Sequence, residues 1–314
     1  MSMLRDIKIY RTSLAFKQPM KFAQHTLKRR EFAFIKAFNI ALNREVVAEL
    51  APLPGFSRES LAQAIAEVIK AAKTQPHKHE FIGPSSAFAW DCLRFGIAPS
   101  QVKPDIPLLQ GCAEQIKAQY LSLNLPTQIK LKVARLAPCI ELEVIHTLVT
   151  LNPQLQLRLD ANQGWDHQQG AAFASQLPIH NIVFIEEPCA TLQDSLYLAE
   201  QFQLPLALDE QLQQPQWPLP SFSHQAIKAL VIKPMLVGSF KRIEQLLTFA
   251  NQHQHQQRAI LSCAFESHYG LGVLATLANK WTPNEAPGLD TAKYFCHTQN
   301  YTLDTSAMER VWPT

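Results

Sequence analysis

Short apolar runs, each ending on a charged or polar residue, recur at regular intervals from residue 129 onward. The runs are IKLKVAR, LQLRLDAN, NIVFIEEP, LPLALDE, ALVIKP and AILSCAF. Their polar end residues, Lys132, Asp160, Glu186, Asp209, Lys233 and Ser262, are separated by 28, 26, 23, 24 and 29 residues. A strand followed by a helix takes about that length, and continuous apolar runs are typical of parallel strands covered by helices. The sequence therefore predicts repeated β-α units.

Several such units can close into a barrel or form an open doubly wound sheet, and the local pattern is the same in both. The positions of the polar residues favour the barrel. At the carboxyl ends of barrel strands they would converge on one mouth, whereas an open sheet would spread them along a line. We expect an α/β fold, a modified TIM barrel of the (β/α)7β type, over residues 96–289.

The first 95 residues have a different pattern, with strands followed by helices. Strands are predicted at 7–10, 32–42 and 46–50, and a helix at 57–73, with Ser57 as its N-cap after the turn APLPGFS. We expect an α+β capping domain over residues 1–95, joined by residues 290–314, whose loops at 16–30 and at the PLPGF turn close over the barrel mouth.

Composition excludes several classes of function. Hydrophobic residues make up 47% and charged residues 18%, as in soluble globular proteins. The net charge of +3 comes from scattered Lys and Arg residues, so no nucleic-acid partner is expected. No apolar run is long enough to span a bilayer, and the six cysteines form no CxxC pair. We expect a cytoplasmic protein with a small-molecule substrate, no membrane partner, and a monomeric or weakly oligomeric state.

Three of the strand-end residues are carboxylates delivered by successive strands: Asp160, Glu186 and Asp209. A single Asp after a strand often caps the next helix, but three in register without an adjacent Cys or His form a hard oxygen site suited to Mg²⁺. The pair His253 and His255 lies in a polar, Gln-rich run and is interpreted as solvated rather than metal-binding.

Lysines lie on both sides of these acids. Lys130 and Lys132 are two residues apart on one predicted strand, so both side chains leave the same face. Burial and mutual repulsion favour a neutral amine that can accept a proton, although the spacing does not say which lysine is the base. Lys233 ends a strand across the barrel, where a buried cation can stabilise developing negative charge. Ser262 is interpreted either as a carboxylate-binding group or as a buried structural serine.

The series KxK, DAN, EEP, DE and KP resembles the enolase superfamily, in its muconate-lactonizing subgroup, over nearly the whole chain. The flanking motifs are similar to those of the proteobacterial branch that forms o-succinylbenzoate: APLPGFSRES, LRLDANQGW, FIEEPCAT, VIKPMLVGS and PGLDT. A Lys or His base with Mg²⁺ is the established pattern of enolase-superfamily sites.

The resemblance implies a role for each matching residue. Asp160, Glu186 and Asp209 would bind Mg²⁺, for which Mn²⁺ could substitute. Lys132 would be the acid and base, and Lys233 would face the opposite side of the substrate. The remaining expected substrate contacts are Lys130, Arg158, Asn162 and Ser262.

The implied reaction is the loss of water from 2-succinyl-6-hydroxy-2,4-cyclohexadiene-1-carboxylate to give o-succinylbenzoate, a step toward menaquinone. N-acylamino acid racemisation and cycloisomerisation stay open, because this subgroup can use the same two lysines for them. A catalytically silent binding protein with this fold is a third possibility, against which the retention of all three acids and all three lysines argues. The strand ending in Ser262 lacks the catalytic His of mandelate-racemase-like members, and WTPNEAPGLDT lacks the Asp-x-Asp motif of dipeptide epimerases.

Overall fold

The computed structural model describes residues 4–74, 80–102, 106–214, 220–252, 257–296 and 303–313. Its contacts divide the chain into two compact units. The first unit comprises Met1–Pro104, Ile232–Gln245 and Leu261–Thr314. The second comprises Asp105–Val231 and Leu246–Ile260. Each unit is described by itself.

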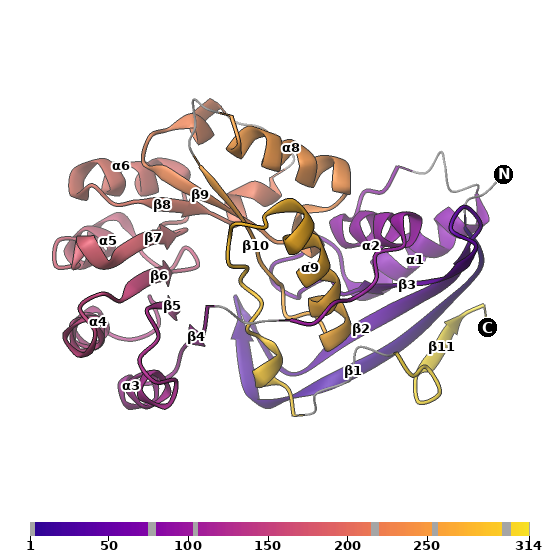
Figure 1. The fold of residues 1–314 in the computed structure, drawn as a ribbon, viewed down its shortest axis with the longest axis horizontal. Coiled ribbons are helices and arrows are strands. Elements are labelled where there is room, and N and C mark those ends of the chain that lie inside the picture. Colours follow the sequence, from indigo (N-terminus) through magenta and orange to yellow (C-terminus); the bar gives the residue numbers. More distant parts are fainter. Residues whose placement is uncertain are drawn as a thin grey trace. The chain divides into compact units, whose positions relative to one another are not determined.

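An antiparallel sheet forms the centre of the first unit, in the strand order β11-β1-β2-β3 (Figure 1). Its strands are β1 (Leu4–Phe22), β2 (His25–Asn39), β3 (Arg44–Leu50) and β11 (Glu309–Trp312). The strand β11, from the C-terminal segment, pairs with β1. The helices of this unit are α1 (Leu61–Lys73), α2 (Pro84–Phe95), α7 (Pro234–Val237) and α9 (His268–Trp281), with the beginning of α8 (Phe240–Ala250) and a 3-10 turn η4 (Ala292–Tyr294).

The predicted order of strands and then helices in the first 95 residues is confirmed, but the predicted start of the first helix is wrong. Ser60 is the N-cap of α1, and it forms a reciprocal capping box with Gln63. The hydroxyl of Ser57 instead accepts a hydrogen bond from the backbone N–H of Leu53, at 2.8 Å, and so stabilises the preceding turn. Either serine hydroxyl could accept from a backbone N–H. Ser57 does so within the turn, and Ser60 caps α1. The predicted strand 32–42 also ends earlier, at Asn39.

A seven-stranded sheet forms the centre of the second unit, in the order β10-β9-β8-β7-β6-β5-β4, and it curves as a partial barrel (Figure 1). Neighbouring strands from β4 to β9 run parallel. The strands are β4 (Leu108–Leu109), β5 (Gln128–Lys132), β6 (Gln156–Asp160), β7 (Ile182–Glu186), β8 (Leu206–Leu208), β9 (Ile227–Ile232) and β10 (Arg258–Leu261).

Helices alternate with these strands along the chain. They are α3 (Ala113–Ser122), α4 (Pro138–Leu151), α5 (His167–Ala174) and α6 (Leu192–Phe202), with 3-10 turns η1 (Ile179–Asn181), η2 (Glu210–Gln213) and η3 (Pro220–Ser223). The predicted α/β class, with an N-terminal α+β part and a barrel-type parallel sheet, is confirmed. All six predicted strands are present; β4 and α3, which carry weaker apolar patterns, precede them.

The contact-based units do not coincide with the predicted division at 95/96 and 289/290. Segments after β9 and β10 join the first unit because α7 contacts α2 and α9 contacts β3. The Tyr269 hydroxyl, for example, donates to the backbone carbonyl of Val47 at 3.0 Å. The domain bounds stay a prediction, and residues 297–302 of the predicted C-terminal extension lie outside the described residues.

Candidate active site

The carboxyl ends of β5, β6 and β7 are in register, and this register builds the centre of the site. Lys132 is paired with Asp160, and Asp160 with Glu186, across the parallel ladder. Paired residues on neighbouring strands project from the same face of a sheet. The apolar residues between them, such as Leu131 and Leu159, are buried and point to the other face. The alternation therefore places all three polar side chains on one side.

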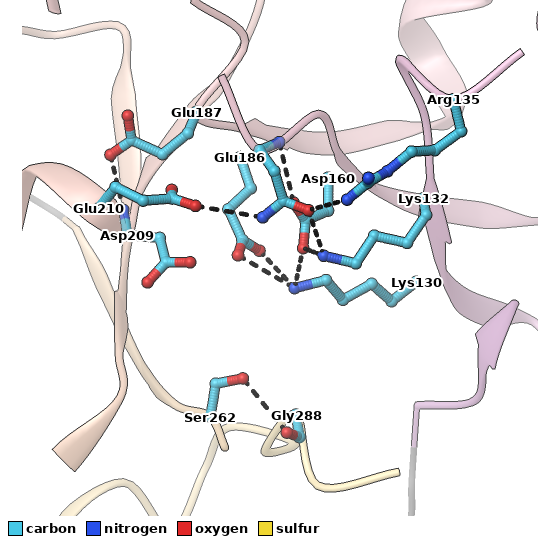
Figure 2. Close-up of polar contacts among 11 residues, drawn as sticks. Lys130, Lys132, Arg135, Asp160, Glu186, Glu187, Asp209, Glu210, Ser262 and Gly288 are labelled. Atoms are coloured by element: carbon cyan, nitrogen blue, oxygen red, sulfur yellow. Dashed lines mark hydrogen bonds and ion pairs between the residues drawn. The ribbon is translucent and has the colours of Figure 1, made fainter. Parts of the chain in front are cut away.

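Two ammonium groups lie against the buried acids (Figure 2). Lys130 Nζ lies 2.7 Å from Asp160 Oδ2 and 2.7 Å from Glu186 Oε2. Lys132 Nζ lies 2.7 Å from the same Asp160 oxygen and 2.5 Å from Asn162 Oδ1. Asp160 is fully buried and Glu186 is 1% exposed, so their negative charges need these partners. The predicted common face of Lys130 and Lys132 is confirmed.

Asn162, just after β6, forms hydrogen bonds with several residues of the site. Its side-chain oxygen accepts from Lys132 and, at 3.0 Å, from Arg135 Nη2, while its amide donates to Glu210 Oε1 at 3.2 Å. Its backbone has a φ of 46°, in the left-handed region that Asn adopts more readily than most residues. This turn directs the backbone N–H of Asn162 toward Asp160, whose Oδ1 accepts from it at 3.2 Å.

A third buried acid, Glu187, organises the end of β8. Its Oε1 accepts from the backbone N–H groups of Asp209 and Gln211, at 2.9 and 3.0 Å. Burial, followed by the nearby charge of Glu210, raises the pKa of Glu187 to about 8. Glu187 thereby fixes the backbone from which the buried side chain of Asp209 projects. Figure 2 shows the carboxylates of Asp160, Glu186 and Asp209 following one another in strand order.

The predicted substrate-binding residue Arg158 is 3% exposed and lies in β6, paired with Lys130 and Phe184. Its guanidinium carbon lies 5.6 Å from the centre of the Phe184 ring, within range of a cation–π interaction. Arg158 thus lies two residues before Asp160 on β6, so both side chains leave the same face of the sheet, and Arg158 lies beside the acids.

Lys233 and Ser262 belong to the first compact unit, and their environment is described there alone. Lys233 is 9% exposed and directly precedes α7. Ser262 directly follows β10, and its hydroxyl donates to the backbone carbonyl of Gly288 at 3.2 Å. A Cβ on Gly288 would lie 2.7 Å from that hydroxyl, so the glycine of the PGLDT motif permits this close approach. The predicted positions of Lys233 and Ser262 facing the substrate stay predictions.

The donor set fits a hard divalent cation. Asp160, Glu186 and Asp209 are buried carboxylates at the ends of three neighbouring strands, and oxygen ligands suit Mg²⁺. Within the described residues, no three His, Cys, Asp or Glu side chains are gathered as a formed metal site. Instead, lysine ammonium groups contact two of the carboxylates. A bound divalent cation and the lysine ammonium groups would each place positive charge beside the buried carboxylates, which need it.

Sequence reasoning missed Arg135, Glu187 and Glu210 as parts of the site. The doublet Glu186-Glu187 and the doublet Asp209-Glu210 each place a second acid directly after a strand-end acid. That signal was available, but the sequence alone does not show whether the second acid of a doublet is buried in the site. His253 and His255 lie outside the described residues. No helix of the described residues is both long and apolar enough to cross a membrane.

Comparison with known families agrees with this architecture. Residues 112–308 match the family described as enolase C-terminal domain-like, and residues 4–97 match the family described as MenC, N-terminal domain. The parallel sheet with acids at its strand ends, preceded by an antiparallel domain, is thus the architecture of the enolase superfamily.

Individual relatives narrow the assignment. The o-succinylbenzoate synthase of Pasteurella multocida is 32% identical over 310 residues, covering 93% of this chain and 90% of the relative. The o-succinylbenzoate synthase of Thermosynechococcus elongatus, solved with magnesium in its active site, has a TM-score of 0.73 and 22% identity, covering 93% and 95% of the two chains. The L-Ala-D/L-Glu epimerase of Bacillus subtilis has a TM-score of 0.79 at 16% identity, covering 95% and 92%. The chain belongs to the o-succinylbenzoate synthase family of the enolase superfamily.

Proposed function

We propose that this chain is a carbon–oxygen lyase that removes water from 2-succinyl-6-hydroxy-2,4-cyclohexadiene-1-carboxylate to give o-succinylbenzoate in menaquinone biosynthesis. The observation that carries the proposal is the position of Lys132 Nζ, which contacts Asp160 and Asn162 at the ends of adjacent strands in a member of this family. The epimerase neighbour shares only the fold, so it does not favour a racemase.

Lys132 moves the proton in this proposal. As a neutral amine it takes the proton from the ring carbon that bears the carboxylate, and the ring hydroxyl departs as the new double bond forms. The lysine ammonium then gives its proton to the leaving hydroxyl, so that water and an aromatic ring are produced.

Asp160, Glu186 and Asp209 would hold Mg²⁺, or Mn²⁺ as a substitute. The bound metal supplies positive charge that stabilises the substrate carboxylate as negative charge develops next to it. Lys130, between Asp160 and Glu186, keeps these acids in place and adds a positive charge. Lys233 would face the other side of the substrate, and Arg158, Asn162 and Ser262 would bind it. A monomeric or weakly oligomeric enzyme in the cytoplasm completes the proposal.

Conversion of the cyclohexadiene substrate in Mg²⁺ buffer tests this function, followed by the absorbance of the aromatic product. Replacing Lys132 with Ala should lower kcat by about 10²–10⁴-fold, because it removes the proton-transfer group. The control Lys117→Ala, at a partly exposed lysine, should leave the rate unchanged. Full activity of Lys132→Ala would refute its role. Racemisation of N-acylamino acids without dehydration would select the racemase, and inactivity on both substrates would select a binding protein.

A further inference from the structure

Glu187 lies where β6, β7 and β8, the strands that lead to the three proposed metal-binding acids, come together. It directly follows β7 and is 2% exposed. Its backbone N–H donates to the carbonyl of Ala207 in β8 at 3.1 Å, and its own carbonyl accepts from the N–H of Gln163, after β6, at 2.7 Å. The main chain of this one residue therefore joins the end of β7 to β8 and to the turn after β6.

The backbone of Glu187 has an unusual conformation for a residue with a side chain. Its φ is 43°, in the left-handed region, which costs free energy for residues other than glycine. The turn after β6 has the same feature, with φ of 46° at Asn162 and 60° at Gln163. Such conformations persist only where surrounding contacts fix them, and they gather at functional sites. The turns after β6 and β7 are therefore held by their contacts in defined shapes.

The Glu187 carboxylate extends these contacts to the turn after β8. Its Oε1 accepts from the backbone N–H groups of Asp209 and Gln211, at 2.9 and 3.0 Å. Its Oε2 accepts from the side-chain amide of Gln163 at 3.3 Å. The turn after each of the three acids is therefore bound to Glu187, either through its backbone or through its carboxylate.

The contact with Gln211 replaces a hydrogen bond that Asp209 would usually make itself. Asp209 is the N-cap of η2, and an Asp at an N-cap usually accepts from a backbone N–H of the first turn. Here the Asp209 side chain makes no capping hydrogen bond, and Glu187 accepts from the Gln211 N–H in its place. Figure 2 shows Glu187 at the backbone of Asp209, while the carboxylates of Asp209 and Glu186 point into the same space.

Carboxylates in fixed positions favour a small cation. Mg²⁺ requires near-ideal octahedral coordination at short metal–oxygen distances, whereas the larger Ca²⁺ accepts a flexible site. We propose that Glu187 is a positioning residue that sets the spacing of the Asp160, Glu186 and Asp209 carboxylates and so gives the site a preference for Mg²⁺ over Ca²⁺. Glu187 acts through the groups that it holds, because both of its oxygens accept from N–H groups. The inference rests on the proposed role of the three acids.

Isothermal titration of the full chain with MgCl₂ and with CaCl₂, without substrate, tests the proposal. Glu187→Met keeps the side-chain length and removes both oxygens. It should raise the Kd for Mg²⁺ about 10–100-fold, which is the usual effect of removing a group that orients metal ligands, and the Kd for Ca²⁺ by less than about threefold. Glu187→Gln keeps an oxygen that can accept from both N–H groups, so both Kd values should stay within about threefold of the wild type.

Glu49→Met is the matched control, in the first compact unit. Glu49 is 4% exposed, and its carboxylate also accepts from two backbone N–H groups, those of Ser267 and Gly270, at 3.0 Å each. Loss of these hydrogen bonds should lower the midpoint of unfolding and leave the Kd for both metals unchanged. The control therefore separates a general loss of stability from a loss of ligand positioning.

Four outcomes would overturn the proposal: a wild-type protein that does not prefer Mg²⁺, an unchanged Kd for Mg²⁺ in Glu187→Met, equal weakening of Mg²⁺ and Ca²⁺ in that variant, or the same change in Glu49→Met. Unfolding curves show whether each variant is folded. If Glu187→Met does not fold, Glu187→Asp carries the test, because its shorter side chain cannot reach both N–H groups and should lower the preference for Mg²⁺ about tenfold. An unchanged preference in Glu187→Asp would then refute the proposal. A protein that shows these metal effects but does not dehydrate the cyclohexadiene substrate would support this inference and refute the proposed function alone.

Discussion

The contact of Lys130 with two buried carboxylates predicts a large change in stability when its charge is removed. In Lys130→Met, the side-chain length is kept and the ammonium group is lost. Asp160 keeps its contact with Lys132, whereas Glu186 loses an ammonium group that lies 2.7 Å and 3.0 Å from its two oxygens. The variant therefore leaves the Glu186 carboxylate, which is 1% exposed, with much less positive charge beside it.

Removing one partner of a buried ion pair costs about 3–5 kcal/mol. The Lys130 side chain is 14% exposed, so we expect the lower end of that range, about 3 kcal/mol. For 314 residues, an unfolding entropy of about 2.1 cal/mol/K per residue converts this loss into a fall in Tm of about 4–5 °C. Mg²⁺ should recover part of that loss, because bound metal replaces the missing positive charge.

Thermal unfolding followed by circular dichroism, in EDTA and in Mg²⁺, measures both effects. Lys117→Met is the matched control: Lys117 forms an exposed pair with Glu143 at 3.3 Å, which should contribute at most about 1 kcal/mol. If Lys130→Met in EDTA unfolded within about 1 °C of the wild type, the Glu186 carboxylate would not depend on Lys130, and the reasoning would be refuted.

Three further predictions concern the first compact unit. Burial raises the pKa of Glu266 from 4.5 to about 7, so the folded state holds a proton that the unfolded chain releases, and stability should fall by about 3 kcal/mol as pH rises from 4.5 to 7. Glu266→Gln should remove this dependence of the free energy of unfolding on pH, which denaturant unfolding at several pH values measures. The same pH dependence in the variant and the wild type would contradict the prediction. Ser60→Ala should lower the free energy of unfolding by about 1 kcal/mol, because it removes the N-cap of α1. The control Ser122→Ala, at an exposed serine, should lower it by less than about 0.5 kcal/mol. Equal urea midpoints for the two variants would exclude a capping role for Ser60. Gly55→Ala should cost about 2 kcal/mol, because φ is 87° and the new Cβ would lie 2.8 Å from the Phe22 carbonyl oxygen; an unchanged unfolding midpoint would show that the turn can relax.

Local pattern predicted much of this molecule. The apolar runs that end at Lys132, Asp160 and Glu186 became β5, β6 and β7, because continuous burial of a short strand leaves a strong signal in sequence. The common face of Lys130 and Lys132 followed from the two-residue period of a strand. The choice between the two serines before α1 was not decided in this way, since either could cap a backbone N–H.

Other features depended on contacts between distant segments. Nothing near Glu187 in the sequence shows that its carboxylate would accept the N–H groups of Asp209 and Gln211, because that contact requires β7 and β8 to lie side by side. Asn162 joins Lys132, Arg135 and Glu210 for the same reason.

The sequence by itself determined the repeated β-α units, the acids and lysines at their strand ends, and the resemblance that led to the family. These follow from periodicity, burial and ligand type, which are local properties of the chain. The tertiary structure alone decided which lysine nitrogen meets which carboxylate oxygen. Hydrogen bonds and cavities depend on distances between segments far apart in sequence, and those distances are set only when the sheet register and the helix packing form together.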